Sequence, residues 1–360
     1  MIKTFSPFVV IKLSIIFDLI LTSQSYPAQA MVYLLVFVFL FISLMVYFRI
    51  AMYFRIIDMP NDRSSHRSFT IRGAGVIFLV SFVLAWGFHF PENTLPTLAA
   101  LLIGGISFVD DRISLSRRLR VLVQFLAVSI LFYKLHVFEH YPLWAILPLF
   151  ILAVGIINAY NFMDGINGIT GLYSLVVLGS LQYVNLYLTP FVYPDLIWFP
   201  MLACLVFLYY NLRIKAKCFA GDVGSISMAF WVVFLILKLM ISGGSWGYIL
   251  FLSVYGVDSV LTIMHRLLRR ENIFEPHRIH FFQLLANEAG WSHLTVSTLY
   301  AVLQIIISIL VIYLIPVMSP YLLSLTILLP LVVLYLVIKP PLMRLIKCTP
   351  PTDESTSLLL

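Results

Sequence analysis

The feature that most constrains this chain is a series of long apolar segments that recurs along almost its whole length. These segments approach the roughly 20 residues that a helix needs to cross the hydrocarbon core of a bilayer. Within lipid, only helices and closed barrels satisfy all backbone polar groups, and these segments lack the two-residue alternation of barrel strands. The chain is therefore predicted to be an all-α, polytopic membrane helical bundle with about 11 transmembrane helices. The predicted spans are 31–50, 74–90, 95–109, 119–136, 143–161, 169–189, 195–211, 223–241, 247–263, 294–315 and 320–338.

The composition agrees with a membrane protein. Apolar residues make up 61% of the chain, charged residues make up 11%, and the mean hydropathy is +1.01. A soluble domain carries about 25% charged residues, so an ordinary soluble fold is excluded. The few cysteines are scattered along the chain, and they predict no disulfide framework.

The placement of Lys and Arg predicts the orientation in the membrane. Most cations fall in polar segments on one side of the bundle, whereas the short turns on the other side contain none. The cation-rich side is expected to face the cytoplasm, because short cytoplasmic loops carry an excess of Lys and Arg. The net charge of +7 either reflects this topology alone or also holds an anionic substrate. The cation-rich segments are 51–73, 110–118, 162–168, 212–222, 264–293 and 339–360.

The two ends of the chain are distinct from its middle. Residues 1–30 combine Lys3, an apolar run and Ala28-Gln29-Ala30, which is typical of a signal-like segment; an extra span and a wrongly assigned start are the alternatives. Residues 31–340 are expected to form a single transmembrane domain. Residues 341–360 are expected to form a cytoplasmic tail without fixed structure.

One polar cluster closes a long apolar span. Asn158, Asn161 and Asp164 follow one another at three-residue spacing, so they lie on nearly the same face of a helix. A carboxylate at the edge of a hydrocarbon span is costly and needs a partner such as a metal ion. The alternative interpretation is a polar helix end that stops at Gly165.

A second and a third acidic position border other spans. Asp110 and Asp111 close one apolar span, and adjacent residues on a helix diverge by about 100°, so they are expected to do different jobs. Carboxylates at an apolar helix end suggest Mg²⁺, and a solvated helix terminus is the alternative. Asp222 begins a later span, where it could complete the metal site or cap the helix, and Phe219 could stack on a planar base.

Two basic clusters could recognise phosphate. Arg63 and His66 lie in the first cation-rich segment, and arginine suits phosphate because it binds in a bidentate way. A loop that only sets the topology is the alternative. His277, Arg278 and His280 form the second cluster, which could hold phosphates; zinc is disfavoured because no nearby residue completes a tetrahedral set.

Five motifs, in the order PNDRSSH, DDR, NAYNFMDG, FAGDVGS and PHRIH, resemble those of the polyprenyl-phosphate N-acetylhexosamine-1-phosphate transferases, which belong to glycosyltransferase family 4. The resemblance covers residues 55–285. The first and last motifs are most similar to the branch that starts surface polysaccharides, which includes the undecaprenyl-phosphate GlcNAc-1-phosphate transferases. The peptidoglycan branch has a last motif richer in histidine.

The resemblance implies a reaction and a location. A UDP-N-acetylhexosamine would react with undecaprenyl phosphate in the presence of Mg²⁺, or alternatively Mn²⁺, to give undecaprenyl-diphosphate-sugar and UMP. This is the first membrane step of O-antigen, capsule or cell-wall polysaccharide synthesis. The protein would be a multi-pass protein of the bacterial inner membrane with its active site facing the cytoplasm. The lipid bilayer is an expected partner, a homodimer is an option, and nucleic acid is not expected.

The resemblance also implies roles for individual residues. Departures from the family pattern include Asn167, which stands where many relatives have Asp and affects the uracil contact. Catalytic roles are implied for Asp110, Asp111, Asp164, His277 and His280. Substrate contacts are implied for Arg63, His66, Asn158, Asn161, Asn167, Phe219 and Arg278. Metal ligation is implied for Asp110, Asp111 and Asp222.

Other classes of protein make different demands on the sequence. A polytopic transporter or flippase for a lipid-linked or anionic substrate would keep ionisable groups near the bilayer midplane, where only Asp258 is expected. A non-catalytic membrane scaffold would show no metal-dependent reaction. A phosphotransferase of the CDP-alcohol type would need a D-G-x-x-A-R signature, and Asp164-Gly165 is not followed by one.

Overall fold

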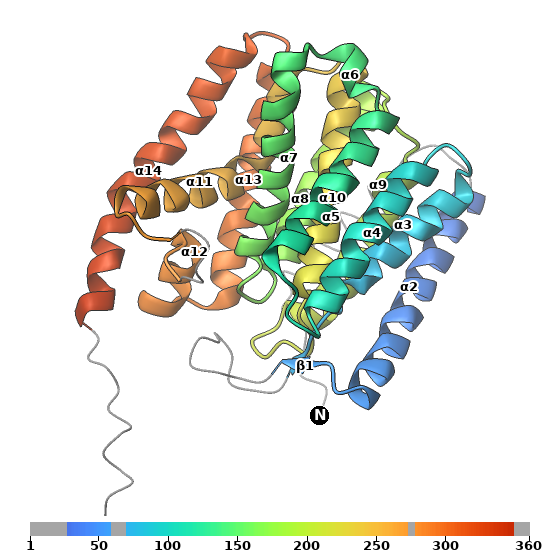
Figure 1. Cartoon of the computed structure of the whole chain (residues 1–360), viewed down its shortest axis with the longest axis horizontal. Coiled ribbons are helices and arrows are strands. Elements are labelled where there is room, and N and C mark those ends of the chain that lie inside the picture. Colours follow the sequence, from blue (N-terminus) through green and yellow to red (C-terminus); the bar gives the residue numbers. More distant parts are fainter. Residues whose placement is uncertain (1–26, 59–69, 273–277, 349–360) are drawn as a thin grey trace, which may run out of the picture.

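The computed structural model describes residues 27–58, 70–272 and 278–348, and it is almost entirely helical (Figure 1). The all-α fold class is confirmed. Arg63, His66 and His277 lie outside the described residues, as do most of the signal-like segment and the end of the tail. The helices and strands in chain order are α2 (Pro27–Tyr53), β1 (Ile57–Asp58), β2 (Thr70–Ile71), α3 (Val76–Phe88), α4 (Thr94–Asp110), α5 (Arg117–Lys134), α6 (Val137–His140), α7 (Leu143–Met163), α8 (Ile169–Tyr187), α9 (Asp195–Asn211), α10 (Gly221–Ile241), the 3-10 helix η1 (Trp246–Leu252), α11 (Ser253–Leu268), α12 (Phe281–Gln283), the π-helix η2 (Leu284–Glu288), α13 (His293–Leu314) and α14 (Pro320–Cys348).

Each predicted span coincides with helix, but the predicted count of about 11 transmembrane helices is not confirmed. Within the described residues, 7 helices are long and apolar enough to cross a membrane. The helices α3, α4 and α9 are apolar but shorter, and α5 begins with a cluster of arginines. The last helix, α14, continues to Cys348 and therefore extends into the predicted tail.

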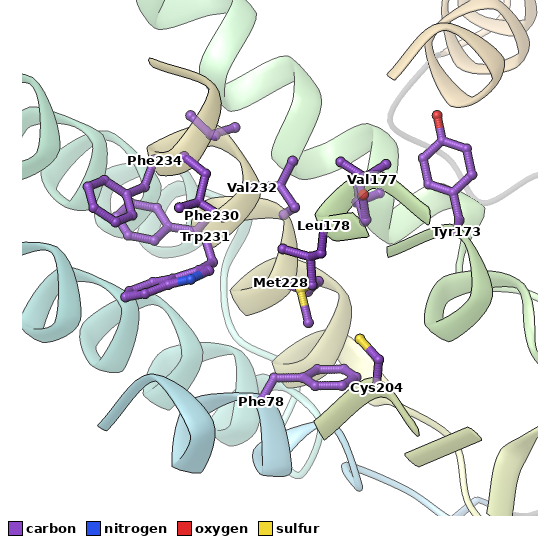
Figure 2. Packing of buried hydrophobic residues seen from close by; sticks show 14 of the residues in the cluster. Phe78, Tyr173, Val177, Leu178, Cys204, Met228, Phe230, Trp231, Val232 and Phe234 are labelled. Carbon is purple, nitrogen blue, oxygen red and sulfur yellow. The ribbon is translucent and has the colours of Figure 1, made fainter. Parts of the chain in front are cut away.

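The centre of the bundle is α10, which packs against α3, α4, α7 and α8. Its residues are buried on all sides, as expected of a helix that is apolar around its whole circumference. Figure 2 shows its side chains, among them Met228 and Trp231, interleaved with those of neighbouring helices. The Trp231 ring stacks on Phe82 with 4.3 Å between centroids, and its Nε1 donates to the Leu196 carbonyl over 2.8 Å. This helix is the fixed element on which the polar end of the bundle is built.

The segment before α3 is joined to the segment before α10 by main-chain hydrogen bonds. Phe219 N donates to Ile71 O over 2.8 Å, and Gly75 N donates to Ala220 O over 3.0 Å. The helices then approach so closely that a Cβ added to Gly75 would lie 2.1 Å from the Gly224 Cα. Only glycine allows this approach. Because Arg72 lies between Ile71 and Gly75, the two contacts place it beside the start of α10.

The described parts of the cation-rich segments 51–73, 110–118, 162–168 and 212–222 lie at one end of the bundle, the lower end in Figure 1. Direct contacts join them: Asn167 Nδ2 donates to the Arg213 carbonyl over 2.8 Å, and Gly168 N donates to Asn211 Oδ1 over 2.7 Å. Helix α11 differs from the others because it runs across the view at a large angle to α7 and α13, and it packs against α14 (Figure 1).

The close approach of α3 and α10 predicts the effect of Gly75→Ala. The added methyl group has no space, so we expect a loss of about 1–3 kcal/mol in the free energy of unfolding, seen as a lower unfolding temperature in detergent. Gly155→Ala is the matched control, because a Cβ at Gly155 would meet no atom within 4 Å. Equal unfolding temperatures for the two variants would contradict the packing.

Candidate active site

The acidic residues of the predicted site all lie at helix ends. Asp110 is the last residue of α4, Asp111 follows it, Asp164 follows α7, and Asp222 is the second residue of α10. These helix ends lie at the same end of the bundle (Figure 1). The structure therefore brings together the acidic residues of the second, third and fourth motifs.

Asp111 fixes the start of α10. Its Oδ1 accepts from Asp222 N over 3.1 Å, its Oδ2 accepts from Val223 N over 3.2 Å, and its side chain is fully buried. These backbone groups lie in the first turn of α10, where N–H groups have no partner within the helix and the helix dipole favours negative charge. Gly221 lies against the carboxylate with φ +71, and a Cβ there would be 2.5 Å from Asp111 Oδ2.

Burial and charge act in opposite directions on Asp111. Burial raises the pKa of its carboxyl group, and Arg72 and the two backbone N–H groups counteract part of the rise. Arg72 Nε donates to Asp111 Oδ1 over 2.8 Å, so the carboxylate is bound on both sides. Both of its oxygens are thus occupied by the protein.

Two arginines cross-link the acidic residues. Besides Asp111, Arg72 lies 3.6 Å from Asp222 Oδ1. Arg120 donates to Asp110 Oδ2 over 2.8 Å and lies 3.9 Å from Asp222 Oδ2. Asp222 therefore lies between two guanidinium groups, but at longer distances than the other carboxylates.

The arginines were incompletely identified from the sequence. Arg72 lies in the first cation-rich segment, which could recognise phosphate or only set the topology, and neither Arg72 nor Arg120 is predicted to pair with an acidic residue. A signal was available for Arg120, because it lies near the start of α5 together with Arg117 and Arg118. Cations near a helix N-terminus oppose the helix dipole, so arginines kept there indicate a specific partner.

Asp164 is the least compensated carboxylate of the group. Its Oδ1 accepts from Thr170 Oγ1 over 2.6 Å, and within the described ranges no Lys, Arg or His forms an ion pair with it. Burial raises its pKa to about 7, with smaller contributions from the negative charges of Asp222 and Asp111. A carboxylate in this setting is stabilised by any cation that enters.

The three asparagines of the third motif serve different contacts. Asn161 Oδ1 accepts from Ser225 Oγ over 2.8 Å, which joins the end of α7 to α10. The Asn158 amide pairs with Gln124 of α5, with 2.9 Å for the shorter bond. Asn167 is buried, and besides Arg213 O its Nδ2 reaches Ile214 O over 3.3 Å, so its side chain holds the loop before α10. Their nucleotide contacts stay predictions.

The fifth motif lies against the third. A Cβ on Gly165 would be 2.9 Å from the Phe282 ring, so this glycine allows the segment after His280 to pack on the end of α7. The His280 ring lies 6.1 Å from that of Phe162, and its Nδ1 lies 3.5 Å from Asp258 Oδ1. His280 is thus brought to the acidic end of the bundle, and Arg278 precedes it by two residues.

The donor set fits a divalent cation that substrate helps to hold. Within the part of the chain that the structure describes, no three His, Cys, Asp or Glu side chains are grouped so as to bind a metal by themselves. Mg²⁺ commonly takes only one or two carboxylates together with water and substrate phosphates. The carboxylates of Asp110, Asp111, Asp164 and Asp222 outnumber the guanidinium groups of Arg72 and Arg120 that contact them, so negative charge remains for a cation.

The fold and the site together define a helical membrane protein with a charged centre at one end of its bundle. The sequence model of glycosyl transferase family 4 matches residues 94–240, which include three of the five motifs. This part of the chain is therefore similar to the family.

Curated proteins are similar over a larger part of the chain. A probable undecaprenyl-phosphate N-acetylglucosaminyl 1-phosphate transferase of Bacillus subtilis is 29% identical over 267 residues, covering 68% of this chain and 74% of that protein. An undecaprenyl-phosphate alpha-N-acetylglucosaminyl 1-phosphate transferase of Yersinia pestis is 28% identical, covering 64% and 69%. A phospho-N-acetylmuramoyl-pentapeptide-transferase of Petrotoga mobilis is 27% identical, covering 46% and 60%.

The raised pKa of Asp164 predicts a pH-dependent effect of Asp164→Asn on stability. Between the ordinary carboxyl pKa and about 7, the folded protein binds a proton that the unfolded chain releases, so wild-type stability falls as pH rises through this window. Asn cannot ionise. We therefore expect the difference in unfolding temperature, variant minus wild type and measured in chelator, to be larger at about pH 8 than at about pH 5.

Glu92→Gln is the control for this measurement, because Glu92 is exposed and lies in the turn before α4, away from the acidic residues. Its difference from wild type should not change with pH in the same way. A constant difference for Asp164→Asn across the pH range would show that Asp164 ionises freely in the folded protein.

Proposed function

We propose that this protein transfers an N-acetylhexosamine-1-phosphate from a UDP-sugar to undecaprenyl phosphate, which gives undecaprenyl-diphosphate-sugar and UMP. The observation that carries the proposal is the meeting of Asp110, Asp111 and Asp222 with Arg72 and Arg120 at one end of the bundle. The names of the relatives from Bacillus subtilis and Yersinia pestis support the lipid phosphate acceptor.

The chemistry requires little proton transfer. A phosphate monoester has a second pKa of about 6, so the lipid phosphate is mostly a dianion at neutral pH and is already nucleophilic. One of its oxygens attacks the β-phosphorus of the UDP-sugar. The bond from that phosphorus to the bridging oxygen breaks, and UMP leaves with this oxygen. The bond between the sugar and its phosphate is unchanged.

The main barrier is the approach of two anions. The guanidinium groups of Arg72 and Arg120 are placed to neutralise charge on the transferring group, and such preorganised charge lowers the barrier of phosphoryl transfer. His280 and Arg278, from the fifth motif, are proposed to contact the diphosphate. His277, Arg63 and His66 are proposed to add phosphate contacts.

Mg²⁺ would neutralise charge on the transferring phosphoryl group when it is bound. Asp222 is the carboxylate best suited to ligate it, because both of its ion pairs with arginine are long, 3.6 and 3.9 Å. Asp111 accepts the backbone N–H of Asp222 and so positions this ligand, and Asp110 is held by Arg120 beside it. These carboxylates act through charge and position rather than by removing a proton.

The proposed setting is the cytoplasmic face of a bacterial inner membrane. UDP-sugars are cytosolic, and the cation-rich end of the bundle, which carries the site, is the end that the positive-inside rule assigns to the cytoplasm. The proposed pathway step is the first membrane step of surface polysaccharide synthesis.

A transfer assay tests the proposal directly. The purified protein is incubated with undecaprenyl phosphate and a panel of UDP-N-acetylhexosamines, and UMP release and lipid product are measured with Mg²⁺, with Mn²⁺ and with chelator. We expect release with at least one donor, its loss in chelator, and a loss of about 100-fold or more in Asp222→Asn. The absence of UMP release with every donor would overturn the proposal. A labelled phospho-enzyme would replace the direct attack by a two-step route through an aspartyl phosphate.

The contacts of Arg120 predict a specific effect of Arg120→Gln. Removal of a preorganised charge from the transferring group is expected to lower kcat by about 100-fold. Arg118→Gln is the matched control, since Arg118 is exposed in the same helical turn. Similar rates for both variants would show that the helix contributes only general positive charge.

A further inference from the structure

Asp258 of α11 is a buried carboxylate that the proposed reaction does not use. Its side chain is 3% exposed, yet it lies in an apolar helix. Phe281 N donates to its Oδ1 over 2.8 Å, Phe282 N reaches its Oδ2 over 3.4 Å, and Tyr300 OH donates to Oδ2 over 2.8 Å. His280 Nδ1 lies 3.5 Å from Oδ1. Burying a carboxylate costs free energy unless it is hydrogen-bonded in this way. We therefore expect Asp258 to have a specific role.

The partners of Asp258 come from the fifth motif and the segment after it. The carboxylate accepts the backbone N–H groups at the start of α12 (Phe281–Gln283), although it belongs to a helix more than twenty residues earlier in the chain. The segment that carries His280 is therefore attached to α11 by its main chain as well as by its imidazole. A transported ion or substrate would find the oxygens of Asp258 already engaged.

His280 is near both Asp258 of α11 and Phe162 of α7. With Nδ1 directed at the Asp258 carboxylate, the other ring nitrogen, Nε2, points away from it. The His280 ring lies 6.1 Å from Phe162 of α7, and Phe282 packs on Gly165, the neighbour of Asp164. The buried imidazole is thus constrained by the Asp258 carboxylate on one side and packs near Phe162.

The last helix supports the same group. Lys339 of α14 is buried, and its Nζ donates to Thr262 Oγ1 over 2.9 Å and to the Tyr335 hydroxyl. Thr262 Oγ1 in turn lies 3.3 Å from Asp258 Oδ1. A buried cation near the carboxylate offsets part of its charge, and the contacts hold α14 against α11.

We propose that Asp258 is a positioning residue for His280, and that it sets the orientation of this imidazole toward the diphosphate of the donor. The inference rests on the proposed function, because transfer is its readout. Removal of the outer partner of a metal-bound histidine costs about 10- to 100-fold in metal affinity or activity, and we expect a loss of the same order here. The carboxylate does not touch substrate, so kcat should fall while KM for both substrates stays close to the wild-type value.

A double-mutant cycle tests the proposal in the full-length protein. Asp258→Asn keeps the shape and an acceptor for one of the two backbone N–H groups but removes the charge, and kcat is expected to fall by about 10- to 100-fold. His280→Ala is expected to lower kcat further. If Asp258 acts through His280, adding Asp258→Asn to His280→Ala will cause little further loss. A merely structural role would instead give losses that multiply.

Tyr300→Phe is the matched control, because it removes a hydrogen bond to Oδ2 and leaves Oδ1, which faces His280, unchanged. We expect a lower unfolding temperature but a nearly wild-type kcat. If Asp258→Asn does not fold, Asp258→Glu replaces it in the cycle, since it keeps the charge but displaces the carboxylate.

The outcomes separate this inference from the proposed function. If the wild type is active, three results overturn the positioning role and leave the transferase function intact. These are losses that multiply, full activity in Asp258→Asn, and full activity in His280→Ala. An inactive wild type overturns the proposed function, and the positioning role with it. An active wild type with non-multiplicative losses supports both.

Discussion

The interaction on which the charged end of the bundle depends is the acceptance of two backbone N–H groups of α10 by Asp111. It joins the end of α4 to the start of the most buried helix, and it fixes the position of Asp222 because one of the two N–H groups belongs to that residue. Arg72 binds the same carboxylate from the opposite side. The close approach of Gly75 and Gly224 then brings Arg72 to this point, so packing in the apolar bundle and electrostatics at its end depend on each other.

A charged centre at the end of an apolar bundle costs free energy, and its ion pairs show which carboxylates are well compensated and which are not. Arg72 and Arg120 pair most closely with Asp111 and Asp110, at 2.8 Å, and they lie farther from Asp222. Asp164 has a hydroxyl partner and a raised pKa. The better compensated carboxylates hold the structure, whereas the poorly compensated ones leave negative charge that the proposed divalent cation would balance. A divided acidic group of this kind suits a site that is completed by its substrates.

The helices and the acidic positions were predictable because their signals are local. Apolar runs gave the helix positions, and Asp110, Asp111, Asp164 and Asp222 stand at the ends of these runs. The number of spans was not predictable in the same way, because α3, α4 and α9 are apolar like the full spans but shorter. The pairing of Arg120 with Asp110, and of His280 with Asp258, depends on helix packing, so periodicity could not reveal it. The contacts of the Asn167 amide with main-chain carbonyl groups of the loop before α10 were likewise not predictable from the sequence, and its nucleotide contact stays a prediction.

Asp111 and Asp258 make the same kind of contact at two different places in the bundle. Each is buried in the bundle, and each accepts two backbone N–H groups at the start of a helix that lies elsewhere in the chain. Each is also approached by a cationic or imidazole group, Arg72 in one case and His280 in the other. A carboxylate that is bonded to main chain on one side and to a functional side chain on the other transmits the rigidity of the helix to that side chain. In an apolar bundle, which otherwise offers only non-directional packing, such carboxylates supply the directional bonds that fix polar side chains at its end.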